Sequence, residues 1–339
     1  MSYSIYNHHV LLRDGVRTSS YWKAIFEVVK KGDCAIDLGS GTGILGFFAL
    51  KAGAGKVYCI EYSDVMQLSK EIAQINGFKE KVIFLKGDFS LMRFPERVDV
   101  IISELLGYFA IEENLLNDLF RARDKILKDN GKMIPEKVRM FLAPVEFPDF
   151  YRKFEFWDKS YYGMDFSPMR KYLINDYFVE RVKEGAFLSS PLCIKKVDFY
   201  NDTCALLDTH FKFRVKREGE FHGFAGWFDA QLSPDVVLST SPSSRETHWK
   251  QSFFPVDGSV KVESGDTISG RVLTIEAGSD IIWKWSGEVI KTRKDRKEVI
   301  YTFEQSTFMD YPLDPENIKK FSPGYRPLLS SYGKLAFET

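Results

Sequence analysis

Residues 35–50 read AIDLGSGTGILGFFAL, in which an apolar run, a glycine-rich turn and an apolar helical pattern follow one another directly. Gly39, Gly41 and Gly43 let the backbone approach a ligand closely, and free N–H groups at the start of a helix favour a negative group there. The stretch therefore predicts a strand, a ligand-binding turn and a helix.

The same alternation continues along the first 130 residues. Helical patterns are expected over 20–30, with Thr18 or Ser19 as the cap, and over 44–51, 64–76 and 114–128, the last ending at the turn KDNGK. Short apolar runs lie between them, at 34–39, 56–63, 81–88 and 98–104. Apolar strands that alternate with helices predict a parallel sheet covered on both faces.

After Pro135 the pattern changes to many short strand-like runs. These runs lie at 137–147, 193–200, 210–217, 221–232, 259–264, 280–289 and 298–306. Such spacing is typical of a β-barrel or β-sandwich. An insertion at about 148–185 is too rich in aromatic residues for a solvated loop, and it is expected to pack on something, such as a second subunit.

Bulk composition limits the function classes. The chain has 339 residues, 44% of them hydrophobic, which is enough for two cores, and its 47 basic and 47 acidic residues leave no excess charge for direct nucleic-acid binding. The N-terminus lacks the apolar region of a signal peptide, and no run reaches the roughly 18 apolar residues of a membrane span. We therefore expect a cytoplasmic protein without membrane or nucleic-acid contacts.

The cysteine and histidine patterns indicate neither a disulfide framework nor a metal centre. The four cysteines show no CxxC pair and are predicted to be buried reduced thiols. His8 and His9 lack companions at metal-ligand spacing, so no metal site is expected.

The glycine turn by itself fits two ligands. Gly41, Gly43 and Gly46 also match the G-x-G-x-x-G register of dinucleotide-binding proteins, and both NAD and S-adenosylmethionine predict an acid at the end of the next strand, which Glu61 supplies. Asp37, just before the glycines, favours S-adenosyl-L-methionine, because a carboxylate attracts an ammonium group and repels a pyrophosphate.

Four motifs together resemble the protein arginine N-methyltransferases of the type I-like group with a THW loop. They are RDGVRTSSYW at 13–22, the glycine turn through EYS at 36–63, IISELLGYFAIEENLL at 101–116 and THWKQSFF at 247–254, and the resemblance covers about residues 8–305. It implies a Rossmann-like α/β methyltransferase domain at 20–135 and a β-barrel or β-sandwich substrate domain at 136–339. It further implies a segment over the cofactor site at 1–19, a helical dimerisation arm at about 148–185, a C-terminal extension at about 307–339, and a homodimer.

The resemblance also implies residue roles. Glu104 and Glu113 would clamp a substrate guanidinium, and Tyr108 would line the acceptor site. Trp249 would line the same site or pack in the core, whereas Glu112 is expected to be solvated or to begin a helix. Glu113, or the pair of His248 with Asp14, would accept the proton, and both remain open. S-adenosyl-L-methionine would be held by Arg17, Asp37, Gly39, Gly41, Glu61, Asp88 and Ser90.

These expectations favour methyl transfer to the guanidino nitrogen of arginine in a protein or peptide. Two alternatives stay open: methylation of a small guanidino or amino compound, and a catalytically silent regulatory subunit. Nicotinamide-dependent chemistry ranks behind them, because no matching hydride-transfer motif is present.

Overall fold

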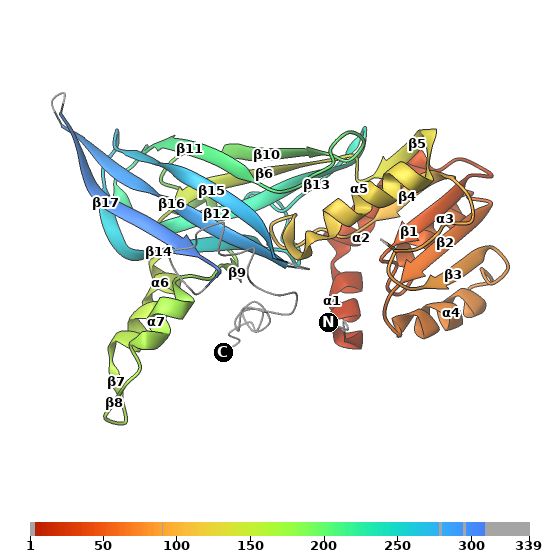
Figure 1. Ribbon diagram of the computed structural model, residues 1–339, viewed down its shortest axis with the longest axis horizontal. Coiled ribbons are helices and arrows are strands. Elements are labelled where there is room, and N and C mark those ends of the chain that lie inside the picture. The colour runs from red at the N-terminus through yellow and green to blue at the C-terminus, as the bar shows by residue number, and fades with distance from the viewer. Residues whose placement is uncertain (1–3, 90, 278–279, 294–295, 309–339) are drawn as a thin grey trace.

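The computed structural model describes residues 4–89, 91–277, 280–293 and 296–308. A parallel sheet with its helices forms one part of the molecule, and two antiparallel sheets form the other (Figure 1). Helices α1 (Ile5–Arg13) and α2 (Gly15–Val28) precede the parallel sheet. In the described part of the chain, no helix combines the length and the apolar character needed to cross a membrane.

The parallel sheet has five strands in the order β3-β2-β1-β4-β5. Its strands are β1 (Cys34–Leu38), β2 (Lys56–Glu61), β3 (Val82–Lys86), β4 (Val98–Ser103) and β5 (Leu127–Ile134), and its helices are α3 (Ile44–Ala52), α4 (Val65–Ile75), the short η1 (Glu112–Asn114) and α5 (Leu115–Ile126). Because the chain order reverses between β1 and β4, a ligand crevice is expected at the carboxyl ends of these two strands. The predicted α/β architecture is confirmed.

Packing around β1 explains why the glycine turn lies at this crevice. All five residues of β1 are buried, and Leu38 lies opposite Ser103 of β4. The turn leaves β1 with Gly41 at φ 52°, a left-handed conformation that glycine adopts without strain. A Cβ on Gly46 would lie 2.7 Å from the Cys59 sulfur, so the glycine lets α3 approach β2 closely.

The antiparallel sheets begin directly after β5. A six-stranded sheet has the order β10-β6-β12-β14-β9 with β13 beside β12, and a four-stranded sheet has the order β11-β15-β16-β17. The strands are β6 (Lys137–Val145), β9 (Phe178–Glu180), β10 (Leu192–Asp198), β11 (Asp208–Arg214), β12 (Gly219–Ser233), β13 (Val236–Ser239), β14 (Gln251–Val262), β15 (Thr267–Ala277), β16 (Asp280–Arg293) and β17 (Arg296–Ser306). This change in strand direction supports the proposed domain division near Pro135.

Helix α5 fastens the two parts to each other. The buried Arg123 side chain donates through Nη1 to the carbonyl oxygens of Phe199 and Asp202, each at 2.8 Å. The Asn117 side-chain oxygen accepts a hydrogen bond from the Ala205 backbone at 2.9 Å. The crevice of the parallel sheet is thus held in a defined position against the antiparallel sheets.

The aromatic insertion forms an arm that projects from the antiparallel sheets, away from the parallel sheet (Figure 1). It comprises α6 (Pro148–Glu155), η2 (Phe156–Asp158), β7 (Ser160–Tyr161), β8 (Met164–Asp165) and α7 (Pro168–Leu173), and β9 and η3 (Glu184–Ala186) follow it. At its root, Phe150 and Phe154 pack in a buried cluster with Phe253 of β14. Farther out the arm exposes a set of large apolar side chains: Phe156, Tyr161, Tyr162, Met164, Phe166, Met169 and Tyr172.

Some sequence expectations were wrong in detail. Helix α2 begins at Gly15 and not at residue 20, because Asp14 caps it by accepting the Arg17 backbone N–H. The KDNGK stretch lies in β5 and not in a turn, although the pairing of β5 with β4 shifts register there. All four cysteines are free, but Cys193 is only half-buried and Cys204 is exposed. The proposed C-terminal extension from 309 onward lies outside the described residues.

Candidate functional site

The acceptor loop, residues 104–114, leaves the carboxyl end of β4 and leads into α5. Glu112 is 7% exposed, and its Oε1 accepts the Phe109 backbone N–H at 2.6 Å. A Cβ on Gly107 would lie 2.7 Å from the Glu112 Cβ, so the glycine makes room for this side chain. The prediction that Glu112 begins a helix is confirmed, because it is the first residue of η1. The alternative of a solvated side chain was wrong, because the carboxylate is buried and accepts a hydrogen bond inside the loop.

Glu104 forms a buried ion pair with Arg17 of α2. Arg17 Nε and Nη2 both contact Glu104 Oε2, at 2.8 Å and 2.6 Å, and the two side chains are 6% and 8% exposed. Burial would lower the pKa of Arg17, but Glu104 raises it above its ordinary value. The resemblance implies a separate partner for each residue, and the structure joins them, since two buried opposite charges compensate one another.

Asp14 links the first helices to the THW stretch. Its Oδ1 accepts the Arg17 N–H at 2.9 Å, and its Oδ2 contacts both the backbone N–H and the ring Nδ1 of His248 at 2.8 Å. Burial alone would raise the pKa of Asp14, but the hydrogen bonds from His248 and Arg17 lower it below its ordinary value. The structure thus brings together the pair that sequence analysis proposed as a proton acceptor.

Trp249 supports the acceptor loop from the protein core. Its side chain is 1% exposed, and its Nε1 donates to the Leu106 carbonyl at 3.0 Å. This burial favours a positioning role over the expected substrate contact. Tyr108 is the half-buried aromatic residue of the same loop, and its contact with substrate stays a prediction.

The glycine turn is held by two acids at the ends of β1 and β2. Glu61 accepts the Gly41 N–H through Oε2 at 2.9 Å and the Ser63 N–H through Oε1 at 2.8 Å. Asp37 is 1% exposed and accepts the Gly46 N–H at 2.9 Å. Burial raises the pKa of Asp37 to about 7.

Helix α1 lies over the glycine turn, and the role of residues 1–19 at a cofactor site stays a prediction. A Cβ on Gly41 would lie 3.1 Å from the His8 Cε1. Burial lowers the pKa of His8, while the nearby Glu61 opposes this shift. Sequence analysis considered His8 only as a metal ligand. Its place on the helical pattern YNHHVLLR, directly before the capping Asp14, was the available signal.

Most predicted site residues converge at the carboxyl ends of the strands of the parallel sheet. The charges of Glu61, Arg17 and Glu104 all act on Asp37, and Gly39 lies against Leu105 of the acceptor loop. Asp88 is exposed just after β3, and the Glu113 backbone lies in η1. Ser90 lies outside the described residues.

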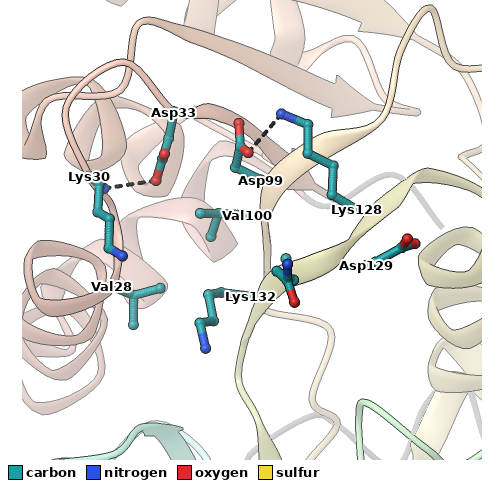
Figure 2. Close-up of a pocket in the computed structure, with 10 residues that line it drawn as sticks. Val28, Lys30, Asp33, Asp99, Val100, Lys128, Asp129 and Lys132 are labelled. Atoms are coloured by element: carbon teal, nitrogen blue, oxygen red, sulfur yellow. Dashed lines mark hydrogen bonds and ion pairs between the residues drawn. The ribbon is translucent and has the colours of Figure 1, made fainter.

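A cavity of about 370 Å³ lies at the amino ends of the strands of the parallel sheet (Figure 2). It is lined by Asp33 before β1, Asp99 in β4 and Lys128 in β5, and Lys128 pairs with Asp99 at 2.7 Å. Because ligands of open α/β sheets bind at the carboxyl ends of strands, this amino-end cavity is not the candidate site.

Comparison with known proteins identifies the family. Residues 29–168 match a methyltransferase domain, and residues 136–280 match the arginine methyltransferase oligomerization subdomain. Protein arginine N-methyltransferase 1.1 of Arabidopsis thaliana is 35% identical over 281 residues, which cover 80% of this chain and 72% of that protein. The chain belongs to the protein arginine N-methyltransferase family. Protein arginine N-methyltransferase 1 of Dictyostelium discoideum is 33% identical over 281 residues, which cover 80% of this chain and 82% of that protein.

Solved structures of family members share the whole architecture. The Trypanosoma brucei PRMT1 enzyme–prozyme heterotetrameric complex with AdoHcy has a TM-score of 0.79 at 26% identity, covering 88% of this chain and 97% of that chain. Arabidopsis thaliana protein arginine methyltransferase 10, in an open conformation, has a TM-score of 0.79 at 27% identity, covering 90% and 98%. The Rossmann-like methyltransferase domain followed by an antiparallel domain is therefore the family fold.

Asp14→Ala is predicted to destabilise the protein by about 1 to 3 kcal/mol, because it removes a helix cap and the acceptor of two His248 hydrogen bonds. Since the pKa of Asp14 is lowered in the folded state, its stabilisation is complete at pH 7 and declines as the pH falls below its ordinary value of 3.8. Denaturant titrations of the wild type and of Asp14→Ala at pH 7 and at about pH 3 would show whether the difference between their free energies of unfolding becomes smaller at the lower pH. Asp64→Ala, which removes an exposed surface ion pair, should cost under about 1 kcal/mol. If Asp14→Ala and Asp64→Ala lowered the free energy of unfolding equally at pH 7, the prediction would be contradicted.

Proposed function

We propose that this protein transfers methyl groups from S-adenosyl-L-methionine to the guanidino nitrogen of arginine in a protein or peptide. The observation that carries this proposal is the buried Glu104 at the end of β4, directly beside the glycine turn. Arg17 contacts Oε2 of this carboxylate, and within the described residues Oε1 is left to a second cation. A guanidinium that binds there would lie next to the proposed methyl donor.

The residues around the turn fit S-adenosyl-L-methionine. Asp37 is a buried acid suited to an ammonium group, Glu61 is suited to ribose hydroxyls, and the glycine backbone permits close approach. The guanidinium of Arg17 and the imidazole of His8 lie at the same end of the sheet and are suited to the methionine carboxylate of the cofactor. When bound, the cofactor supplies an electrophilic methyl group on a sulfonium centre.

The acceptor loop would activate the guanidinium by charge. Glu104 and Glu113 can each accept N–H bonds from it, which localises electron density on one nitrogen and orients that nitrogen. Such orientation can lower the barrier by about 7 to 11 kcal/mol in well-aligned cases. The leaving proton would pass to Glu113 or to His248, whose ring is held by Asp14.

The first prediction of this proposal concerns methyl transfer itself. The wild-type protein should methylate an arginine- and glycine-rich peptide in preference to free arginine, and Glu104→Gln or Glu113→Gln should lower the rate by about 100-fold or more. Transfer of labelled methyl, with chromatography of the hydrolysed product, would measure both rate and product. Glutamine at 104 keeps an oxygen for Arg17, and binding of S-adenosylhomocysteine would confirm that the variants fold.

Glu298→Gln is the matched control, because Glu298 is exposed on β17, and it should leave the rate unchanged. Transfer to free arginine alone would favour the small-molecule alternative. Cofactor binding without transfer to any acceptor would favour the silent regulatory subunit, since the Trypanosoma brucei relative is an enzyme–prozyme complex. Either result would overturn the proposal.

The second prediction concerns the pH dependence of cofactor binding. Burial raises the pKa of Asp37 to about 7, so the carboxyl carries a proton at lower pH, whereas a bound ammonium group favours the carboxylate. Affinity for S-adenosylhomocysteine should therefore rise severalfold from about pH 5.5 to about pH 7. Calorimetry would measure this slope, and Asp37→Asn should weaken binding and flatten it. A slope that Asp37→Asn leaves intact would assign the effect to another group, such as His8.

We also propose a homodimer in which the arm packs on the cofactor domain of the second subunit. The match to the oligomerization subdomain and the exposed apolar side chains of the arm support this arrangement. Light scattering should give the mass of two chains, which decreases on dilution. Replacing Tyr162 and Met164, 94% and 54% exposed, with Asp should give single chains, while Val237→Asp on β13 should not. A concentration-independent monomer mass for the wild type would exclude the dimer.

A further inference from the structure

Trp283 of β16 joins the antiparallel domain to the acceptor loop. Its side chain is 1% exposed, and its ring stacks on Phe109 with centroids 5.3 Å apart and planes 24° from parallel. It also lies 5.4 Å from the ring of Phe254 and 6.3 Å from that of Tyr177. Tyr177 lies between α7 and β9, at the root of the arm. The aromatic cluster therefore connects the arm root with the loop that carries Glu104 and Glu113.

We propose that Trp283 is a positioning residue, which holds the acceptor loop in the conformation that places Glu113 for the substrate guanidinium. This inference rests on the proposed function and adds to it a residue outside the four family motifs. Three features of the loop support it.

The first feature is the burial of Phe109 in the antiparallel domain. Phe109 is 0% exposed, and a Cβ on Gly226 of β12 would lie 2.7 Å from its ring. The glycine thus makes room for the ring, and Trp283 covers it from β16. Phe109 cannot move unless its packing against both strands changes.

The second feature is the connection from Phe109 to the short helix η1. The Phe109 backbone N–H donates to Glu112, the first residue of η1, and Glu113 follows immediately. Any displacement of Phe109 therefore alters the hydrogen bond at the start of the turn that contains Glu113.

The third feature is backbone strain on both sides of Glu113. Ala110 has φ 68° and Asn114 has φ 54°. The left-handed conformation is strained for alanine, whereas asparagine adopts it more readily. Surrounding contacts must hold such a loop in place. Asn114 donates to Glu276 of β15 at 2.6 Å, and Trp283 supplies the corresponding contact at Phe109.

The chemistry of the Trp283 contact is apolar. Among the described residues, its Nε1 has no hydrogen-bond partner although it is buried. The ring area, and not the indole N–H, therefore supports the loop. Phenylalanine should replace tryptophan with little loss, while leucine should not, because it lacks a flat face to stack on Phe109.

The neighbouring Trp285 provides a matched control. It is also 1% exposed and lies 5.4 Å from Phe254, but its Nε1 donates to the Pro255 carbonyl. Trp285→Leu removes a buried tryptophan from the same strand without removing a stacking partner of Phe109. It reports the general cost of a core cavity.

The experiment combines amide hydrogen exchange, cofactor binding and methyl-transfer kinetics on the whole 339-residue chain. Trp283→Leu should increase exchange across residues 105–114 and lower the kcat/KM for peptide by about tenfold or more, because a small misplacement of reacting groups is costly. Its affinity for S-adenosylhomocysteine should stay at the wild-type value. Trp283→Phe should restore both exchange and kinetics, and Trp285→Leu should lower the melting temperature without a selective change in 105–114.

Unchanged exchange in Trp283→Leu, or the same selective increase in Trp285→Leu, would overturn the positioning role. If the wild type transfers no methyl group, the proposed function fails, but the exchange comparison still tests the support of the loop by Trp283. The two hypotheses are therefore separable. A lower kcat/KM without any change in hydrogen exchange would also contradict the proposal, because Trp283 would then affect methyl transfer by some means other than holding the acceptor loop.

Discussion

The buried ion pair between Arg17 and Glu104 is the constraint on which the rest of the site depends. Arg17 lies on α2 and Glu104 follows β4, so the pair fastens the N-terminal helices to the crevice of the parallel sheet. Removal of either charge would leave the other buried without compensation, at a cost of about 3 to 5 kcal/mol. The backbone of Arg17 also binds Asp14, which in turn holds His248. One arginine therefore helps to align the acceptor loop with the THW stretch.

The acceptor loop illustrates how two domains build one site. Its ends belong to the parallel domain, but its middle is supported by the antiparallel domain, through Trp249 at Leu106 and Trp283 at Phe109. Arg123 and Asn117 of α5 fix the domains to each other nearby. A loop with two left-handed residues can persist only where such contacts determine its shape. The antiparallel domain is thus a structural part of the proposed catalytic site.

Much of the fold could be predicted from local patterns. The buried run of β1, the left-handed glycines after it and the following helix are consequences of short-range chemistry, and they appear where the sequence indicates. The errors arose from short-range contacts that the hydrophobic pattern does not reveal, and in one case from a contact between separate elements. Helix α2 begins at Gly15 because Asp14 caps it, and Glu112 is buried because Gly107 leaves space for its side chain. His8 lies beside the glycine turn only because α1 folds over Gly41.

The sequence by itself determined the parallel sheet, its glycine turn, the change to antiparallel strands after Pro135 and the family motifs, because hydrophobic period and turn chemistry are local properties. Only the tertiary structure decided which side chains meet. Arg17 and Glu104 are 87 residues apart, and Trp249 and Leu106 are 143 apart. No pattern within a segment encodes such pairs, since they depend on how whole elements pack. The burial that this packing imposes then sets the charges and the proton affinities of the site.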